Sequence, residues 1–468
     1  MCRLGIGPIL NPRRRSNTTK LGIPANYGKS RGIPAIFLIF LLNAIVMASR
    51  RTFLHHLGLG LSLPGLAAFA LPSTNIPPFP SANLEEEAYW KAIRQQFPLQ
   101  SNRIYLNNGT FGPAPFSVLD ALQKSSLDIN TSGEYGNSDA ERVQLAQFFG
   151  IKTSEFSITH NTTEGINIMA WGIPLQAGDE VILTTHEHAG NALPWLNRAK
   201  YDGIVLRTFE PKGTQTENLN EVQKLINSKT KVIAIPHVTC TTGLVFPIQE
   251  ICSLAKSRGI LTAIDGAHGA GTFNLDLTAM GCDFYAGCFH KWMLGPSGTA
   301  FLYVREESLG KLRPVMIGGH SDTGWDMTSN PPTLAGYVPS ARRFDYGTQS
   351  KALAVGMVAA TEFHDQIGKD RVETRLQTLN QYLMDGLLEL NSKLAIITPL
   401  EKESRISLLT FRPKNISYQV CGNELGKAGF RIRQVPEGKV NAIRVSTHVY
   451  NTKEEVDAFL ATLTRILT

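Results

Sequence analysis

The chain has 468 residues, of which 43% are apolar and 18% charged, the composition of an ordinary globular protein long enough for two domains. Its net charge of +7 arises in the first 84 residues, which hold nine Lys or Arg and neither Asp nor Glu. From Glu85 onward the other 37 of the 46 basic residues stand against 39 acidic ones, so the body of the chain lacks the basic excess typical of nucleic-acid-binding proteins.

Residues 1–70 have the features of a leader that directs export. The twin arginines Arg50 and Arg51 precede a short, Gly-rich apolar stretch at 57–70, which ends in the small-residue pattern of a cleavage site. This order is typical of a twin-arginine (Tat) signal in bacteria. We therefore expect a periplasmic or otherwise exported protein that uses the Tat machinery, with residues 71–84 as a linker after the cleavage site.

The beginning of the chain allows two further interpretations. Met47 stands three residues before Arg50, so translation can begin there, and residues 1–46 would then be upstream sequence included in error. Alternatively, the apolar run at 33–47 anchors the protein to a membrane, although it is shorter than the usual span of about 20 residues.

Residues 85–351 are predicted to form a large domain. A mostly helical stretch at 84–146, interrupted by a short strand from Ile104, is followed by β-rich runs that alternate with helical segments. Such alternation predicts a mainly parallel sheet with helices on both faces and ligands at the carboxyl ends of the strands. An irregular segment follows at 305–351. The predicted strands are 156–159, 181–185, 204–208, 232–238, 260–265, 284–288 and 300–304.

Residues 352–468 are predicted to form a smaller α/β domain. Helical segments cover about 352–391, and an amphipathic helix at 453–466 closes the chain. Strands are predicted between them at 406–411, 430–434 and 442–447.

Two predicted strand ends carry the residues on which the functional hypothesis depends. The run 260–264 ends in Asp265, and the run 284–288 leads to Lys291, a residue normally excluded from such a place unless it is paired or covalently used. A pyridoxal phosphate (PLP) site requires a lysine amine that binds the cofactor covalently and a carboxylate that keeps the pyridine nitrogen protonated. Taken alone, Asp265 or Lys291 could equally be a surface residue at the end of a strand.

Other strand ends supply weaker signals. Thr162 and Thr163, between a strand and a helix, could hold a phosphate with help from the helix dipole, but a helix cap explains them equally well. His188 could stack on a pyridine ring, although a lone loop histidine is more often structural. Arg444, in a strand-like run, could bind a substrate carboxylate with both guanidinium arms or lie on a strand surface.

From about residue 100 to its end, the chain resembles the class V aminotransferase family of the PLP fold-type I superfamily. The resemblance implies an α/β fold with a large domain, built on a mainly parallel seven-stranded sheet, and a smaller C-terminal α/β domain. His268, Lys291 and the run 343–348 are most similar to the isopenicillin-N-epimerase-like branch. The other shared landmarks are Thr162 to Glu164, Glu187-His188 with Asn191 and Pro194-Trp195, Asp265 to His268, His290-Lys291, and Arg444 with Tyr450 to Thr452.

The resemblance also implies a role for each landmark. Lys291 would hold the cofactor covalently, Asp265 would pair with its pyridine nitrogen, and His188 would stack on its ring. His268 would stand near the phenolic oxygen, and Arg444 would bind the substrate carboxylate. The phosphate would be held or faced by Thr162, Thr163, Cys288, His290 and, from the partner subunit of a homodimer, Thr348.

The cysteines narrow the chemistry. Cysteine desulfurases and selenocysteine lyases of this family carry a nucleophilic cysteine on a small-domain loop, whereas the equivalent stretch here, 433–439, has none, and Cys421 lies earlier in a helical pattern. Persulfide transfer is therefore not expected. The six cysteines of the chain show no paired spacing and no metal signature.

The expected function is PLP-dependent chemistry at the α-carbon of an amino acid or of an amino-acid-containing metabolite. An aminotransferase is the first expectation, and an epimerase or a lyase that breaks a C–S bond or eliminates a β-group is the alternative. These outcomes stay open because all begin with removal of the α-proton. A non-catalytic binding protein is the rival from another class, and the set Lys291, Asp265, His188 and Arg444 argues against it.

Overall fold

A computed structural model describes residues 76–468. The predicted twin-arginine signal and the alternative anchor at 33–47 lie outside these residues. Within them, none of the helices combines the length and the apolar character that crossing a membrane requires.

The larger sheet has seven strands in the order β2-β8-β7-β6-β5-β3-β4. Its strands run parallel except for β8, which is antiparallel to both of its neighbours, so the prediction of a mainly parallel seven-stranded sheet is confirmed. The strands are β2 (Phe156–Thr159), β3 (Glu180–Thr184), β4 (Val205–Phe209), β5 (Thr230–Ile233), β6 (Leu261–Asp265), β7 (Phe284–Cys288) and β8 (Ala300–Val304).

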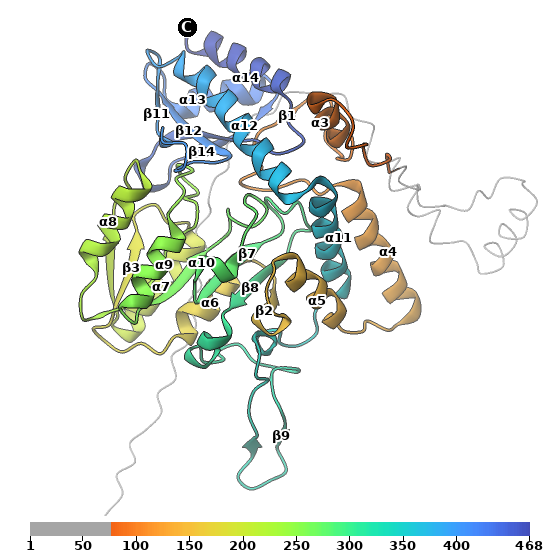
Figure 1. Cartoon of the computed structure of the whole chain (residues 1–468), viewed down its shortest axis with the longest axis vertical. Coiled ribbons are helices and arrows are strands. Elements are labelled where there is room, and N and C mark those ends of the chain that lie inside the picture. Colours follow the sequence, from red (N-terminus) through yellow and green to blue (C-terminus); the bar gives the residue numbers. More distant parts are fainter. Residues whose placement is uncertain (1–75) are drawn as a thin grey trace, which may run out of the picture. The chain divides into compact units, whose positions relative to one another are not determined.

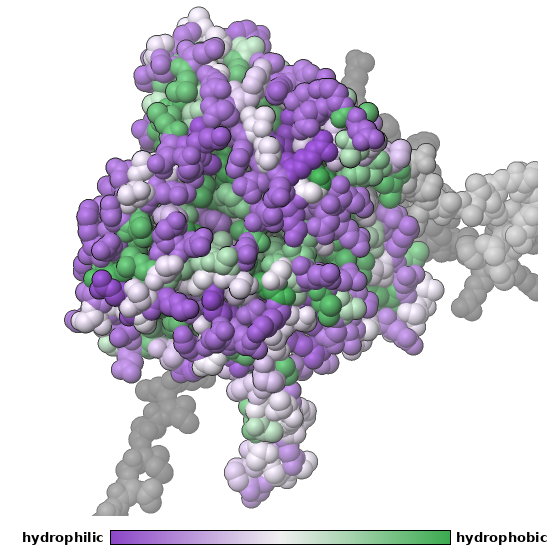
Figure 2. Space-filling view, in the orientation of Figure 1, coloured by the Kyte–Doolittle hydropathy of each residue, from purple (hydrophilic) through white to green (hydrophobic). Residues whose placement is uncertain are grey.

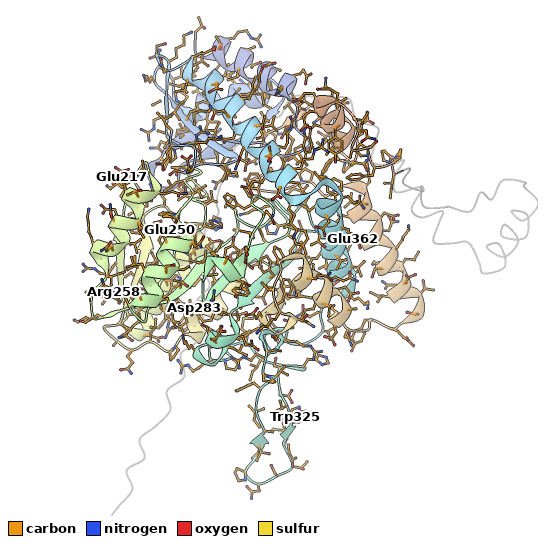
Figure 3. The ribbon with its side chains drawn as sticks, viewed as in Figure 1. Glu217, Glu250, Arg258, Asp283, Trp325 and Glu362 are labelled. Atoms are coloured by element: carbon orange, nitrogen blue, oxygen red, sulfur yellow. The ribbon has the colours of Figure 1, made fainter. Side chains whose placement is uncertain are left out.

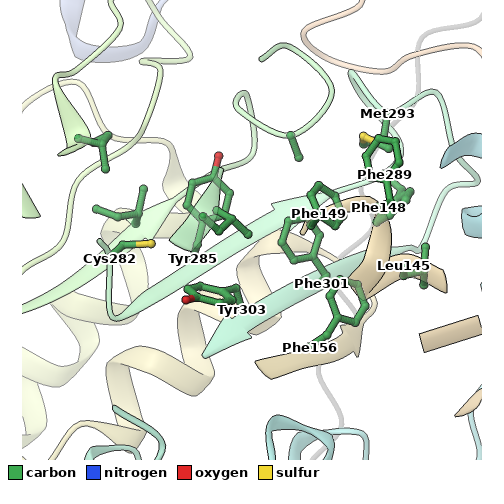
Figure 4. Packing of buried hydrophobic residues seen from close by; sticks show 14 of the residues in the cluster. Leu145, Phe148, Phe149, Phe156, Cys282, Tyr285, Phe289, Met293, Phe301 and Tyr303 are labelled. Atoms are coloured by element: carbon green, nitrogen blue, oxygen red, sulfur yellow. The ribbon is translucent and has the colours of Figure 1, made fainter. Parts of the chain in front are cut away.

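Helices cover both faces of this sheet (Figure 1), because most of its strands are apolar on both sides. One face packs on α6 (Thr162–Gly172) and α7 (Ala189–Asp202). On the other face, Phe301 lies between Phe149 and Phe156, with ring centroids 4.5 and 5.4 Å away (Figure 4). The remaining helices of this part are α4 (Phe116–Ser132), α5 (Asp139–Phe148), α8 (Gln215–Leu225), α9 (Ile248–Ser257) and α10 (Leu277–Met280).

The C-terminal part carries a second, antiparallel sheet in the order β11-β12-β15-β14. The predicted helical stretch 352–391 is two helices, which separate at Gly368, whose φ of +94° favours glycine. The predicted strand 430–434 is likewise divided, because its first half pairs with β1 and its second half with β15. The elements are α11 (Lys351–Ile367), α12 (Lys369–Leu388), β11 (Leu394–Ile396), β12 (Leu408–Pro413), α13 (Tyr418–Lys427), β13 (Phe430–Arg431), β14 (Arg433–Val435), β15 (Ala442–Ser446) and α14 (Lys453–Ile466).

The first described elements pack on the C-terminal part. Strand β1 (Ile104–Tyr105) pairs in parallel with β13, and α3 (Glu86–Arg94) contacts α12 through an ion pair of 2.8 Å between Glu87 and Arg375. This pairing brings the turn at 107–112 between the two sheets, where Gly112 N donates to His290 O over 2.8 Å. The domain boundaries predicted from the sequence stay predictions.

The predicted irregular segment at 305–351 contains a hairpin that projects from the body (Figure 1). Its strands are β9 (Trp325–Asp326) and β10 (Thr333–Leu334), and Trp325 is 67% exposed on this hairpin (Figure 3). Hydrophilic residues predominate on the face of the body shown in Figure 2. The rest of the segment returns to the large sheet, where Asp345 accepts hydrogen bonds from Ser157 Oγ at 2.6 Å and Ile158 N at 3.1 Å.

Candidate active site

The carboxyl ends of β2, β3, β6 and β7 meet around one cavity of about 230 Å³. All the predicted cofactor and substrate residues line it except Thr348. The turn at 109–110, the start of β14, the middle of β15 and the segment around Cys240 complete its wall. The lining residues are Gly109, Thr110, Asn161, Thr162, Thr163, Ile166, His188, Gly190, Cys240, Asp265, Ala267, His268, Cys288, His290, Lys291, Arg433 and Arg444.

Lys291 stands in the turn after β7, and its amine faces the cavity. Its Nζ lies 3.3 Å from His268 Nε2. The backbone behind the lysine is held by the turn at 107–112, which approaches so closely that a Cβ at Gly112 would overlap the Lys291 carbonyl oxygen. The amine is therefore presented on a backbone that both sheets help to fix.

Asp265 ends β6, on the strand next to β7, and is only 5% exposed. One carboxylate oxygen accepts a hydrogen bond from Ala267 N at 3.0 Å. Burial raises the pKa of Asp265, while this hydrogen bond and the charges of Lys291 and His188 act in the opposite direction. A buried carboxylate that faces a cavity is suited to pairing with a cationic N–H of a ligand.

The N-terminus of α6 offers a site for an anion. Its first-turn amides have no partner within the helix, and the helix dipole favours negative charge there. Asn161 caps the helix by accepting a hydrogen bond from Glu164 N at 2.9 Å. Thr162 Oγ1 and His290 Nδ1 are buried and have no hydrogen-bond partner within residues 76–468. Two unpartnered polar atoms beside this helix end fit the phosphate of PLP.

His188 caps α7 at the end of β3 and accepts a hydrogen bond from Gly190 N at 3.0 Å through Nδ1. Partial burial and the Lys291 charge lower the pKa of His188, so its ring is neutral at neutral pH. A Cβ at Gly190 would lie 2.5 Å from Thr163 Oγ1, so glycine permits this close approach. The flat neutral ring therefore lies beside the N-terminus of α6, where it can stack on a heteroaromatic ring.

Glu187, next to His188, contributes no second negative charge at neutral pH. Burial raises the pKa of Glu187 to about 8, and the nearby Asp265 charge acts in the same direction. The carboxyl group accepts hydrogen bonds from Thr184 N at 2.9 Å and from Asn191 Nδ2 at 2.7 Å. It thus holds the loop between β3 and α7 in place and leaves Asp265 as the carboxylate that faces the cavity.

Arg444, in the middle of β15, is 1% exposed, which excludes the surface position considered from the sequence. It donates hydrogen bonds to Cys240 O at 2.6 Å and to Thr110 Oγ1 at 2.9 Å, and its Nε has no partner in the described part of the chain. Burial and the Arg433 charge lower the pKa of Arg444 to about 9, so it keeps its positive charge at neutral pH. A buried cation with an unpartnered N–H is suited to a carboxylate.

His268 has a defined tautomer because of Trp292. The indole Nε1 lies 3.1 Å from His268 Nδ1, and an indole can only donate, so Nδ1 is the acceptor. Burial and the Lys291 charge hold the pKa of His268 well below its usual value, so the ring is neutral and its single proton is on Nε2. His268 therefore presents an N–H donor to the cavity.

Several lining residues were not predicted from the sequence. Thr110 and Arg433 come from a turn and a strand whose closeness depends on the pairing of β1 with β13. Cys240 follows the predicted strand 232–238 by two residues. Of these residues, only Arg433 could have been noticed in the sequence. Like Arg444, it is a cation in a β-rich run, where charged residues are unusual.

Thr348 is exposed and does not line the cavity of its own chain. It follows Asp345, which is fixed on β2 by its hydrogen bonds and by an ion pair with Arg142. Its predicted contact with the phosphate of a partner subunit stays a prediction.

Comparison with known proteins identifies relatives that match this chain over nearly their whole length. Residues 104–459 match the family model described as aminotransferase class-V. A protein named "Probable cysteine desulfurase" from Halalkalibacterium halodurans is 30% identical over 395 residues, covering 78% of this chain and 95% of that protein. The isopenicillin N epimerase of Amycolatopsis lactamdurans is 29% identical over 386 residues, covering 79% and 96%.

The fold is similar to that of the cystine C–S lyase C-DES. Its complex with the reaction product cysteine persulfide has a TM-score of 0.72 and 25% identity, covering 79% of this chain and 99% of that one. A mutant of the same lyase, solved with glycine covalently linked to its PLP cofactor, has a TM-score of 0.71 and 24% identity, covering 79% and 98%. The likeness confirms the predicted fold, a large domain with a seven-stranded sheet and a smaller C-terminal domain.

Trp292→Phe tests the tautomer of His268. Without the indole donor, the neutral ring can place its proton on Nδ1, and the Nε2 donor is lost. We expect nitrogen NMR of the cofactor-free protein to show a change from the Nε2–H to the Nδ1–H form. In the loaded protein, His268 would no longer donate a hydrogen bond to the phenolic oxygen of the cofactor. The pH at which the visible cofactor band changes should therefore rise by about one unit, the scale of one lost hydrogen bond.

Trp171→Phe is the matched control, because Trp171 lies on α6 outside the cavity lining. It should alter neither measurement. An unchanged His268 tautomer in Trp292→Phe would show that the indole does not set the proton position.

Proposed function

Because the chain belongs to the class V aminotransferase family, we propose that it removes the α-proton from an amino acid, or from a metabolite that carries an amino-acid unit, and then completes epimerisation or elimination. The enzymes of this family that it resembles are PLP-dependent, and PLP is its cofactor. The relatives' names, cysteine desulfurase and isopenicillin N epimerase, support these outcomes better than the transamination first expected from the sequence.

The single observation that carries the proposal is the convergence of Lys291, Asp265 and Arg444 on one cavity. When bound, PLP supplies an electron sink for the charge that develops at the α-carbon. Lys291 would hold the cofactor covalently, Asp265 would keep its pyridine nitrogen protonated, and Thr162 with His290 would hold its phosphate.

The chain's own residues would orient the substrate and move the proton. Arg444 binds the α-carboxylate through its unpartnered Nε and so fixes the α-carbon. The Lys291 amine, which faces the cavity, would accept the α-proton. Glu187 is protonated at neutral pH and cannot accept that proton, and burial lowers the pKa of His188 and so makes its ring a weaker base than the Lys291 amine.

Epimerisation is the leading candidate among the outcomes. The stretch 433–439, where the family's desulfurases carry their nucleophile, has no cysteine. In residues 76–468 only Cys240 and Cys288 reach the cavity, and burial raises the pKa of both thiols, which keeps them protonated and weakly nucleophilic. Elimination is the second candidate, supported by the similarity to a cystine C–S lyase.

The product formed in D₂O distinguishes the outcomes. The leaderless holoenzyme, incubated with a panel of L-amino acids and γ-glutamyl peptides, should yield the opposite stereoisomer with one deuterium at the α-carbon. Elimination would instead release ammonia and a keto acid. Lys291→Ala should lower turnover at least about 10³-fold, since it removes the proton acceptor. Amino-group transfer to an added keto acid at the rate of substrate loss would contradict the proposal.

We also propose that the enzyme is a homodimer in which the partner subunit's Thr348 reaches the phosphate. The proposal rests on the family resemblance and on the exposed position of Thr348 outside its own cavity. Sedimentation should give twice the mass of the leaderless chain. Thr348→Ala should weaken cofactor retention about tenfold, the scale of one hydrogen bond to a charged group, whereas Thr378→Ala on the exposed face of α12 should not. A monomer that retains PLP would rule out the dimeric site.

Export through the Tat pathway is the proposed localisation, supported by Arg50 and Arg51 before a short apolar stretch. Replacing both arginines by lysine should keep the protein in the cytosol of a Tat-competent bacterium. The control variant Arg13→Lys with Arg14→Lys should be exported normally. Export that is unaffected by the change at Arg50 and Arg51 would eliminate this proposal.

A further inference from the structure

A second cavity of about 740 Å³ opens beside the catalytic one, and we call it the annex. The two cavities share Thr110 and Arg433. The annex lies between the segment from Arg103 to Thr110 and the helix and strands from Val420 to Gln434. Its position beside the inner cavity allows one ligand to occupy both.

Basic residues outnumber acidic ones in the lining of the annex. Four of its lining residues are basic, and Glu424 is the single acidic one. Glu424 pairs with Lys427 at 2.8 Å. Arg103 and Arg431 are exposed to solvent, and neither has a carboxylate within 4.0 Å among residues 76–468. Since acidic residues slightly outnumber basic ones from Glu85 onward, this cluster is no reflection of a generally basic surface.

Arg433 stands between the two cavities and has unused hydrogen-bonding capacity. It pairs with Glu437 through Nη2, but its Nη1 is buried and has no hydrogen-bond partner in the described part of the chain. A buried N–H of a cation without an acceptor is costly in the free protein. An anionic or carbonyl group that passes from one cavity to the other would satisfy it.

Resting on the proposed function, we propose that the annex binds the anionic end of an extended substrate. The amino-acid unit lies in the inner cavity, where Arg444 takes its α-carboxylate, and its side chain passes Arg433 to a distal carboxylate held by Arg103 and Arg431. The substrate class is therefore an amino acid extended through its side chain to a second anion, such as a γ-linked acidic peptide. A free amino acid with a short neutral side chain leaves the annex empty.

The test compares two ligands that differ only in the distal charge, γ-L-glutamylglycine and γ-L-glutamylglycinamide. Calorimetry on the leaderless holoenzyme should show the acid binding about tenfold more tightly than the amide, as expected for two partly exposed ion pairs. Arg103→Gln with Arg431→Gln should abolish this preference. The matched control, Arg258→Gln with Arg313→Gln, removes two exposed arginines outside both cavities and should keep it (Arg258 is labelled in Figure 3).

The outcomes separate this proposal from the function on which it rests. Equal affinities for the acid and the amide, failure of both to bind, or a preference that survives the change at Arg103 and Arg431 would overturn the annex proposal. The visible cofactor spectrum, recorded on the same samples, reports on the inner site independently. A spectral change without a charge preference would leave the proposed function intact, whereas a charge preference without a spectral change would support the annex and count against the function.

Discussion

The parallel pairing of β6 with β7 is the constraint on which the whole site depends. Its register sets Asp265 opposite Ala286, so the buried carboxylate lies beside the strand that leads to Lys291. The attraction between this carboxylate and the lysine opposes the cost of burying them. Asp265 ends β6 and Lys291 follows β7 by three residues, so the pairing of these two central strands brings both residues to the same edge of the sheet.

Several ionisable side chains around Asp265 and Lys291 carry no charge at neutral pH. His188, His268 and Glu187 are neutral at neutral pH because burial disfavours their charged forms. Asp265, the Lys291 amine and the guanidinium groups of Arg433 and Arg444 are left to define the field in the cavity. Such a fixed arrangement needs little reorganisation when charge develops on a substrate, which is how a buried site stabilises a transition state.

The sequence predicted the sheet well because its strands are short, apolar and separated by helical segments. Strands β2, β7 and β8 begin and end where they were predicted, Asp265 ends β6, and Lys291 follows β7. Predictions were weaker where structure depends on contacts between distant segments. The pairing of β1 with β13 brings Thr110 and Arg433 to the cavity, and a local pattern cannot indicate a contact over more than 300 residues.

The central claim is that Lys291 holds PLP in this cavity, and chemical trapping tests it most directly. The leaderless protein is loaded with PLP, treated with borohydride to make the covalent link permanent, digested, and analysed by mass spectrometry. The account predicts that the cofactor is found on Lys291, and that Asp265→Asn keeps the label there but alters the visible spectrum. A label on another lysine, or a protein that takes up no cofactor, would contradict it.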